Sequence, residues 1–231
     1  MSRDARESVG RFKRDAALAA VAAEVRDGML VGLGSGSTAA YAIQEIGRRI
    51  REDRWRLLGV PTSERTAALA REAGVPLVPL DAAPDVAIDG ADQVDPSLAV
   101  VKGRGGAHAR EKVVASASKR VAIIADYTKA VERLTAPVPL EVLPFAVAWI
   151  PRALAGLVPR GEAHVRMRDG RPFTTDNGNP IIELVCGVID DPSGLAAALD
   201  AMPGVVEHGL FVGIANVVYL AGPEGIKIAQ I

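Results

Sequence analysis

Four short polar segments combine residue types that bind anions and move protons. They lie at residues 34–38, 89–92, 102–106 and 126–129, and each follows an apolar run. Backbone N–H groups in a glycine loop that opens a helix attract an anion such as a phosphate. Carboxylates beside a turn can take up protons from carbon or from hydroxyl groups. Together the four segments indicate a site for a small anionic ligand.

The loop at residues 34–38 has the composition of a phosphate site. It joins a short apolar run to residues 39–50, whose apolar side chains recur at helical spacing. Ser35, Ser37 and Thr38 would add hydroxyl donors to the backbone N–H groups of the loop. A tight turn that ends in a helix-capping hydroxyl would give the same pattern. The loop alone therefore leaves both interpretations open.

The same loop matches a loose dinucleotide-binding pattern, Gly34-x-Gly36-x-x-Ala39. In folds that bind NAD, an acidic residue about 20 positions further on ends the second strand and binds the ribose hydroxyls. Here the second apolar run, residues 56–60, is followed by Pro61 and has no carboxylate at its end. A nicotinamide cofactor is therefore disfavoured.

Charged side chains in the other segments are candidates for proton transfer and charge stabilisation. Asp89 and Asp92 flank a turn directly after a buried apolar run. Lys102 opens a second glycine loop, and Glu111 lies within the first helical turns after it. Each has a plainer alternative, because aspartates often cap turns and a helix-start acid complements the helix dipole. Lys129, which follows another strand, could equally be a solvated loop lysine.

Metal and hydrolytic sites are not supported. His108, His164 and His208 are scattered, and no second histidine or cysteine stands at ligand spacing from any of them. Ser37 and Ser63 have no histidine at a telling spacing either, so a catalytic triad is not indicated.

Composition limits the classes of partner and the compartment. The 27 Lys and Arg almost cancel the 28 Asp and Glu, so no positive field gathers nucleic acid or an acidic membrane surface. Residues 1–14 lack the apolar core of a signal peptide, and no apolar stretch approaches the roughly 20 residues that span a bilayer. A lone cysteine, Cys186, suits a reducing compartment. We expect a cytoplasmic protein without nucleic-acid or membrane partners.

The first half of the chain alternates between helical and strand-like patterns. Such alternation predicts a doubly wound α/β fold, Rossmann-like, in which helices cover both faces of a mostly parallel sheet. The carboxyl ends of parallel strands meet at one edge, where ligands bind, so the four polar segments should gather there. The expected helices are residues 15–25, 39–50, 64–73 and 108–118, and the expected strands are residues 29–33, 56–60, 76–80, 85–88 and 120–125.

After the proline-rich segment 137–144 the pattern becomes that of a second, smaller α+β domain. Two late strand-like runs, residues 210–214 and 217–221, could rejoin the first domain or close the second. We predict a catalytic domain of residues 1–130 plus about 208–231 and a small domain of residues 131–207. Expected elements of the small domain are helices 146–157 and 193–201 and strands 163–168, 172–175 and 181–188.

Seven short motifs follow one another along the chain. They are Gly32-Leu33-Gly34-Ser35-Gly36-Ser37-Thr38-Ala39, Pro61-Thr62-Ser63, Asp89-Gly90-Ala91-Asp92, Lys102-Gly103-x-Gly105-Gly106-Ala107, Arg110-Glu111-Lys112, Thr175-Asp176-Asn177-Gly178-Asn179 and Pro203-Gly204-Val205-Val206-Glu207-x-Gly209-Leu210-Phe211. In this order they strongly resemble the type A family of ribose-5-phosphate isomerases. The resemblance covers nearly the whole chain, from about Phe12 to Gly225.

This resemblance implies an interconversion of ribose 5-phosphate and ribulose 5-phosphate through an enediolate, with no cofactor and no metal. Glu111 would be the base that moves a proton between C2 and C1. Lys102 and the N–H groups of its loop would stabilise the developing oxyanion. Asp89 and Asp92 would bind substrate hydroxyls and assist opening of the furanose ring.

The family also implies a wider binding set and a quaternary structure. Members have a small α/β domain beside the main one and form homo-oligomers, usually dimers or tetramers. The loop at residues 34–38 binds substrate in the family, and the helix-terminus argument assigns it the phosphate. The expected substrate-binding residues are Ser35, Gly36, Ser37, Thr38, Asp89, Gly90, Ala91, Asp92, Lys102, Gly103, Arg104, Gly105 and Lys129.

Two departures from the family pattern and two rival functions remain. Arg104 replaces a glycine in the second loop, where arginine would tolerate a positive φ poorly, and Gln93 replaces an acid. His108 is interpreted as an incidental helix-start histidine. An amino-sugar-phosphate deaminase would share the scaffold and the proton transfer. A sugar-phosphate sensor for transcription would need a DNA-binding module or a basic face, and the sequence supplies neither.

Overall fold

The computed structural model describes the fold of residues 3–230, with side-chain detail from residue 7. These residues divide into two compact units. The first unit contains the chain up to Ala91, Arg110–Ala130 and the chain from Ile214, and the second contains Asp92–Ala109 and Val131–Gly213. The sequence predicts one boundary after residue 130, a return near residue 208, and residues 92–109 in the larger domain. The structure groups residues 92–109 with the second unit because strands in that segment pair with a strand near residue 210.

The first unit is built on a six-stranded sheet in the order β15-β14-β6-β3-β1-β2. Five neighbouring strands are parallel, and only the edge strand β15 is antiparallel to its neighbour. This confirms the predicted α/β class with a mostly parallel sheet. The strands are β1 (Leu30–Leu33), β2 (Leu58–Pro61), β3 (Val86–Gly90), β6 (Val121–Asp126), β14 (Val217–Gly222) and β15 (Gly225–Gln230).

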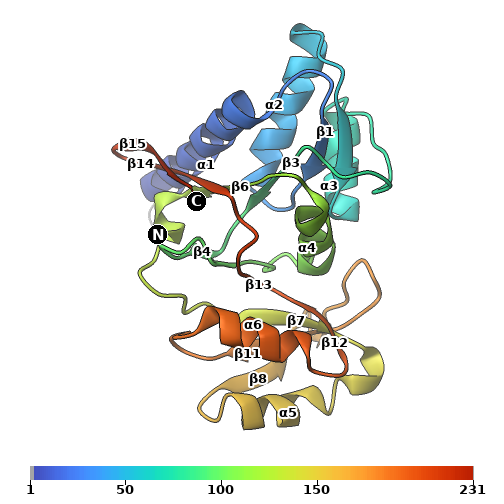
Figure 1. Cartoon of the computed structure of the whole chain (residues 1–231), viewed down its shortest axis with the longest axis vertical. Helices are drawn as coiled ribbons and strands as arrows, with labels where there is room; N and C mark the ends of the chain where they lie inside the picture. The colour runs from blue at the N-terminus through green and yellow to red at the C-terminus, as the bar shows by residue number, and fades with distance from the viewer. Residues whose placement is uncertain (1–2, 231) are drawn as a thin grey trace. The chain divides into compact units, whose positions relative to one another are not determined.

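Helices cover this sheet because each presents an apolar stripe to it. The helices are α1 (Arg3–Glu24), α2 (Ala39–Glu52), α3 (Glu64–Glu72) and α4 (His108–Ala117). α1 and α2 lie side by side (Figure 1). Val21 and Ile43 of these helices belong to the same buried cluster as Val31 and Ile88 of the strands. Gly32, whose position alternates with Val31 in β1, lets Val114 of α4 approach, because a Cβ there would overlap that side chain.

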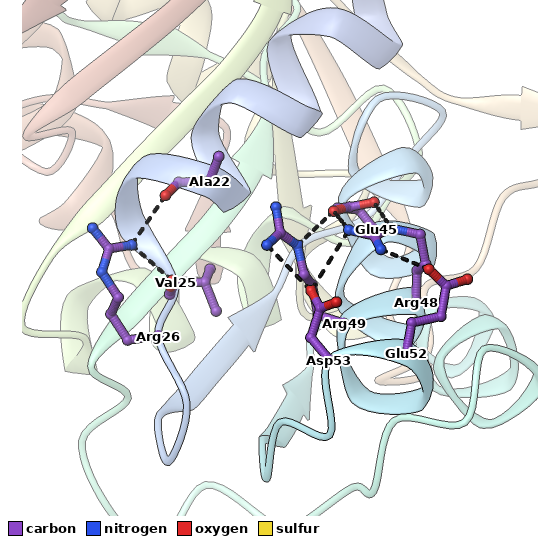
Figure 2. Close-up of polar contacts among 8 residues, drawn as sticks. All are labelled: Ala22, Val25, Arg26, Glu45, Arg48, Arg49, Glu52 and Asp53. Carbon is purple, nitrogen blue, oxygen red and sulfur yellow. Dashed lines mark hydrogen bonds and ion pairs between the residues drawn. The ribbon is translucent and has the colours of Figure 1, made fainter.

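Charged side chains form hydrogen bonds along α2 and at the end of α1. Arg26 donates to two carbonyl oxygens at the C-terminal end of α1, at 2.8 and 3.1 Å (Figure 2). On α2, Glu45 accepts from both Arg48 and Arg49 at 2.7 Å, and Arg48 also donates to Glu52 at 2.7 Å. The hydrogen bond from Arg48 is the main reason that the pKa of Glu45 lies below its ordinary value. The contacts on α2 span three or four residues, as expected on a helix surface.

The second unit is built on an antiparallel sheet in the order β12-β7-β11-β8. Leu140 and Ile182 pair in register and face a core that also contains Ile150 and Leu199 from the two helices. The alternate residues of β7 and β11, such as Glu141 and its partner Ile181, face the other side of the sheet. The elements are β7 (Val138–Val142), β8 (Glu162–Val165), β11 (Ile181–Val185), β12 (Val205–His208), α5 (Ile150–Leu157) and α6 (Pro192–Asp200).

Two smaller sheets complete this unit. One is a short hairpin, and the other has the order β13-β5-β4 and frames the second glycine loop. The hairpin consists of β9 (Met167–Arg168) and β10 (Arg171–Pro172), and the other sheet of β4 (Gln93–Val94), β5 (Val100–Val101) and β13 (Leu210–Phe211).

Several element predictions need correction. The predicted strand 76–80 forms only one isolated bridge, between Leu77 and Gly59, because prolines on both sides of it interrupt the hydrogen-bond ladder. The proline-rich segment 137–144, for which the sequence predicts no helix or strand, contains β7, an interior strand of its sheet. α1 begins at Arg3 rather than near residue 15, and β12 and β15 are strands that the sequence does not predict. Among the described helices, none is long and apolar enough to cross a membrane.

Candidate active site

The loops after β1 and β3 meet at the carboxyl edge of the first unit's sheet. β1 lies between β2 and β3, so the chain leaves β1 toward one side and later returns on the other. Gly34 donates from its backbone N–H to the Ile88 carbonyl at 3.0 Å, and Ser35 donates from its N–H to Oδ1 of Asp89 at 3.0 Å. Such a reversal of strand order is where open α/β sheets bind ligands.

Asp89 is held in place by the backbone around it. Its side chain is buried, and Oδ1 also accepts from the N–H of Gly90 at 2.7 Å. A Cβ on Gly34 would overlap the carboxylate and the Cα of Asp89. Glycine at position 34 therefore allows the first loop to pass directly over the aspartate.

The Ser35 hydroxyl belongs to a buried hydroxyl cluster rather than to the loop surface. Its Oγ lies 2.9 Å from Oγ1 of Thr62, 2.8 Å from Oγ of Ser63 and 2.9 Å from Oγ1 of Thr66. Thr66 also donates to the Gly34 carbonyl at 3.0 Å. These bonds give the Pro61-Thr62-Ser63 motif a structural role, fixing the first loop against the start of α3. Sequence patterns gave no sign of it because the partners lie about 30 residues apart.

The rest of the first loop presents donors at the start of α2. Gly36 has φ 99°, a left-handed conformation that glycine adopts without strain. Thr38 is the N-cap residue, but its side chain makes no capping bond. The Ser37 hydroxyl accepts from the ammonium of Lys13 on α1 at 3.0 Å. Lys13 thus brings a positive charge to the predicted phosphate loop. The sequence does not point to this lysine, because it lies on a separate helix.

Lys129 lies in a short turn at the end of β6. The 3₁₀ turn Tyr127–Lys129 is capped by the buried Asp126, whose Oδ1 accepts from both the N–H and the hydroxyl of Thr128. β6 is the neighbour of β3, so this turn follows a strand end on the same edge of the sheet as Asp89. The prediction that segment 126–129 shares this edge with the first loop is confirmed by the strand order.

Glu111 does not behave as a surface acid at a helix start. It lies in the first turn of α4, yet only 5% of its surface is exposed. Its neighbour Arg110, by contrast, reaches outward to pair with Glu64 at 3.0 Å, and the Glu64 side chain is 72% exposed. A carboxylate that served only the helix dipole would have no reason to leave water.

The second glycine loop is shaped by its surroundings in the second unit. Lys102 is 3% exposed, its backbone N–H donates to the Gly209 carbonyl at 2.8 Å, and its ammonium lies 5.1 Å from the ring centre of Phe211. Positive φ angles occur at Gly103 and Gly106, at 107° and 81°. The φ angle of Arg104 is not positive, so an arginine can occupy this position without backbone strain. Its backbone N–H donates to Oδ2 of Asp92 at 3.2 Å.

Comparison with known proteins decides the family. Residues 58–225 match the family model for ribose 5-phosphate isomerase A (phosphoriboisomerase A). A protein named ribose-5-phosphate isomerase A from Chloroflexus aurantiacus is 50% identical over 217 residues, covering 91% of this chain and 90% of that protein. The chain belongs to the ribose 5-phosphate isomerase A family.

Solved structures of the isomerase family agree. The ribose 5-phosphate isomerase A of Methanocaldococcus jannaschii is 40% identical, with a TM-score of 0.91 over 96% of this chain and 99% of that one. A D-ribose-5-phosphate isomerase in complex with phospho-erythronic acid is 38% identical, with a TM-score of 0.92 and the same coverage. The recognition made from the seven motifs is thereby confirmed.

Gln93, one of the two departures from the family pattern, has a defined structural role. Its side-chain Oε1 accepts from the backbone N–H groups of Thr135 and Ala136, both at 2.7 Å. Its amide nitrogen donates to the Thr135 hydroxyl at 3.0 Å. A side-chain amide can donate and accept hydrogen bonds at the same time, so glutamine can make all three of these bonds to the segment before β7.

The Thr175–Asn179 motif of the isomerase family surrounds a buried acid that the sequence reasoning missed. Glu141 of β7 is fully buried, and its Oε1 accepts from the amides of Asn177 and Asn179 at 3.0 and 2.8 Å. Its backbone N–H lies 3.2 Å from Nε2 of His108, which is also fully buried. His108, interpreted from the sequence as an incidental helix-start histidine, therefore accepts a hydrogen bond in the protein interior.

One group of side chains among the described residues has the spacing of metal ligands. Ligand atoms of Asp200, Glu207 and His208 lie within 4.8 Å of one another. However, Leu210 donates from its N–H to Nδ1 of His208 at 3.2 Å, so the ring proton must lie on Nε2, which is 3.0 Å from Oδ1 of Asp200. Nε2 then donates to the carboxylate, and its lone pair is not available to a metal.

Proposed function

We propose that this chain catalyses the interconversion of ribose 5-phosphate and ribulose 5-phosphate. The observation that carries the proposal is membership of the isomerase A family over nearly the whole chain, at up to 50% identity. The activity places the chain in the non-oxidative part of the pentose phosphate pathway. The structure adds side chains whose chemistry suits each step of an isomerisation.

Proton transfer is assigned to Glu111. Its carboxylate takes the proton from C2 of the open-chain aldose, and the electron pair left behind forms the enediolate with the carbonyl at C1. Transfer of the O2 hydroxyl proton to O1, together with return of the same carbon-bound proton to C1, gives the ketose. The burial of Glu111 supports this role, because a base shielded from water can keep the proton that it takes from C2 and return it to C1.

Stabilisation of the enediolate is assigned to Lys102 and its loop. The ammonium of Lys102 and the backbone N–H groups of Gly103 and Gly105 would meet negative charge as it develops on oxygen. Lys102 has little exposure to water, and such shielding strengthens its electrostatic effect. Asp89 and Asp92 would bind the sugar hydroxyls and assist ring opening, supported by the fixed position of the Asp89 carboxylate.

Phosphate binding is assigned to the loop between β1 and α2. Ser37, Thr38 and the backbone N–H groups from Gly36 onward open a helix, and Lys13 adds a cation 3.0 Å from the Ser37 hydroxyl. Because the Ser35 hydroxyl lies in the buried cluster, Ser35 would act mainly by holding the loop. Gly90, Ala91 and Lys129 remain proposed contacts to the sugar.

Further parts of the proposal concern the setting of the enzyme. We propose that it works without a metal or an organic cofactor, forms a homo-oligomer of two or four chains, and acts in the cytoplasm. Lys102 and oriented N–H groups would supply the charge stabilisation that a metal gives in other isomerisations.

The test is a coupled assay of ribose 5-phosphate conversion after exhaustive chelation. Formation of ribulose 5-phosphate at an unchanged rate in EDTA supports the proposal. Loss of the rate, restored by a divalent ion, contradicts the metal-free mechanism. Ammonia release from an amino-sugar phosphate, with no conversion of ribose 5-phosphate, would favour a deaminase instead.

A further inference from the structure

Arg166 binds the backbone of the second glycine loop. It lies between β8 and β9, and its Nη1 donates to the Gly103 carbonyl at 3.0 Å and to the Arg104 carbonyl at 3.2 Å. Only 13% of the Arg166 side chain is exposed. A single guanidinium therefore holds two successive peptide groups of the loop that carries Lys102.

Glu183 fixes the orientation of this guanidinium. Its Oε1 lies 2.5 Å from both Nε and Nη2 of Arg166, and its own side chain is only 19% exposed. Glu183 lies on the face of β11 that points away from the helices, and it pairs in register with Pro139 of β7. The Phe173 ring, 5.7 Å from the guanidinium carbon, adds a further contact. An arginine held this way is a rigid donor.

The consequence for the loop follows from peptide geometry. In a trans peptide the N–H points opposite to the carbonyl, and the described residues contain no cis peptide bond. Because the Gly103 carbonyl accepts a hydrogen bond from Arg166, the N–H of Arg104 in the same peptide points away from Arg166. This N–H donates to Oδ2 of Asp92 at 3.2 Å. Because the Arg104 carbonyl also accepts from Arg166, the N–H of Gly105 in that peptide points away from Arg166 as well. Gly105 is exposed, and a Cβ there would meet nothing within 4 Å.

We propose that Arg166 is a positioning residue that sets the N–H groups of the Lys102 loop before substrate binds. The proposal rests on the proposed isomerase function of this loop. A peptide dipole oriented in advance stabilises an enediolate oxygen without reorganisation during the reaction. Without Arg166, the same peptides can rotate and present a carbonyl oxygen, whose partial negative charge opposes the enediolate.

The experiment compares Arg166→Ala and Arg166→Lys with Arg168→Ala. Arg168 is the matched control, because it lies two residues further along the chain and stacks on the same Phe173 ring at 4.2 Å. Unlike Arg166, it is exposed and, within the described part of the chain, makes no hydrogen bond to the loop carbonyls. For each variant, kcat, KM and the inhibition constant of phospho-erythronic acid are measured with ribose 5-phosphate as substrate. This compound carries a planar, anionic carboxylate that resembles the enediolate, so its competition with substrate reports on binding of the intermediate.

Arg166→Ala should lower kcat by about 10- to 100-fold, somewhat less than the loss of a direct oxyanion donor. Its affinity for phospho-erythronic acid should fall more than its KM rises, because the loop dipoles act on the anionic intermediate. Arg166→Lys should recover part of kcat, and Arg168→Ala should retain the wild-type value.

Two results would overturn the positioning role. One is a folded Arg166→Ala enzyme with kcat within twofold of wild type, and the other is an equal loss in Arg168→Ala. If Arg166→Ala does not fold, Arg166→Lys decides, since wild-type kcat and inhibitor affinity there would overturn the role as well. Turnover by the wild-type enzyme is measured first, and its absence would instead contradict the proposed function.

Discussion

The backbone N–H of Ser35 donates to Oδ1 of Asp89 over 3.0 Å, joining the loop after β1 to the end of β3. This bond fixes the predicted phosphate loop relative to a carboxylate proposed to bind sugar hydroxyls. The two residues are 54 positions apart in the sequence. They meet because parallel strands deliver their carboxyl ends to one edge of the sheet.

Gly34→Ala should damage both stability and activity. The new Cβ would overlap the carboxylate and Cα of Asp89, so the loop or β3 must shift. We expect the free energy of unfolding to fall by about 1–3 kcal/mol, as for other overpacked sites, and kcat/KM to fall with it. Thermal unfolding and steady-state kinetics check this.

Gly156→Ala provides the control for that substitution. Gly156 lies in α5, and a Cβ there would meet nothing within 4 Å. Alanine should therefore raise stability by about 0.5–1 kcal/mol without changing kcat/KM. If Gly34→Ala behaves like Gly156→Ala, the close approach of the loop to Asp89 does not constrain the site.

Thr38→Ala and Ser35→Ala should separate substrate binding from loop stability. The Thr38 side chain makes no capping bond, so its loss should mainly raise KM for ribose 5-phosphate and change kcat less. Ser35 has three hydroxyl neighbours within 2.9 Å, so its loss should lower the free energy of unfolding by about 1–2 kcal/mol. A Thr38→Ala enzyme with normal KM would place the phosphate elsewhere.

Glu24→Gln should reveal a pH-dependent contribution to stability. Glu24 ends α1, where its charge opposes the helix dipole, and it accepts from Arg120 at 2.6 Å and from Tyr219 at 2.7 Å. Burial raises the pKa of Glu24, but the bonds from Arg120 and Tyr219 outweigh burial and leave that pKa below its ordinary 4.5. Burial and the same contact raise the pKa of Tyr219 to about 12.

A lowered folded-state pKa gives stability that is present above about 4.5 and is lost as the pH falls through the folded value. At pH 7 Glu24→Gln should lower the free energy of unfolding by about 1 kcal/mol. This is a small value for a charged hydrogen bond, because the Arg120 side chain is 40% exposed to solvent. The difference from wild type should shrink below pH 4. Urea unfolding at several pH values measures this difference. The control is Glu224→Gln, which should show a much smaller change with pH, because the ion pair of Glu224 with Lys227 is open to solvent. A difference that is constant with pH would contradict the assignment.

The first unit was largely predictable because its strands are continuous apolar runs between glycine loops and helical patterns. Residues 34–38, 89–91 and 126–129 follow strands of the parallel sheet, as predicted. Residues 102–106, expected at the same edge, instead follow β5 of a small antiparallel sheet in the second unit. The strand β7 was not predictable in this way, since Pro137 and Pro139 are residues that interior strands rarely contain. Its ladder tolerates Pro139 although β7 is central in the sheet.

Contacts between distant residues explain most of what the sequence reasoning missed. Nothing in the pattern around Ser35 shows that its hydroxyl meets Thr62 and Thr66, and nothing around Arg166 points to the carbonyls of Gly103 and Arg104. These contacts depend on how loops cross in three dimensions. Residue type and sequence spacing do not show which loops come into contact.

The central claim, that Glu111 moves the proton, is tested most directly by Glu111→Gln. Glutamine keeps the size and hydrogen-bonding reach of the side chain but cannot take up a proton. We expect a normally folded variant that binds ribose 5-phosphate and loses about 10²- to 10⁴-fold in kcat. Measuring kcat, substrate affinity and Tm on one preparation gives the answer. A variant with wild-type kcat would contradict the account and leave Asp89 or Asp92 as the next candidate base.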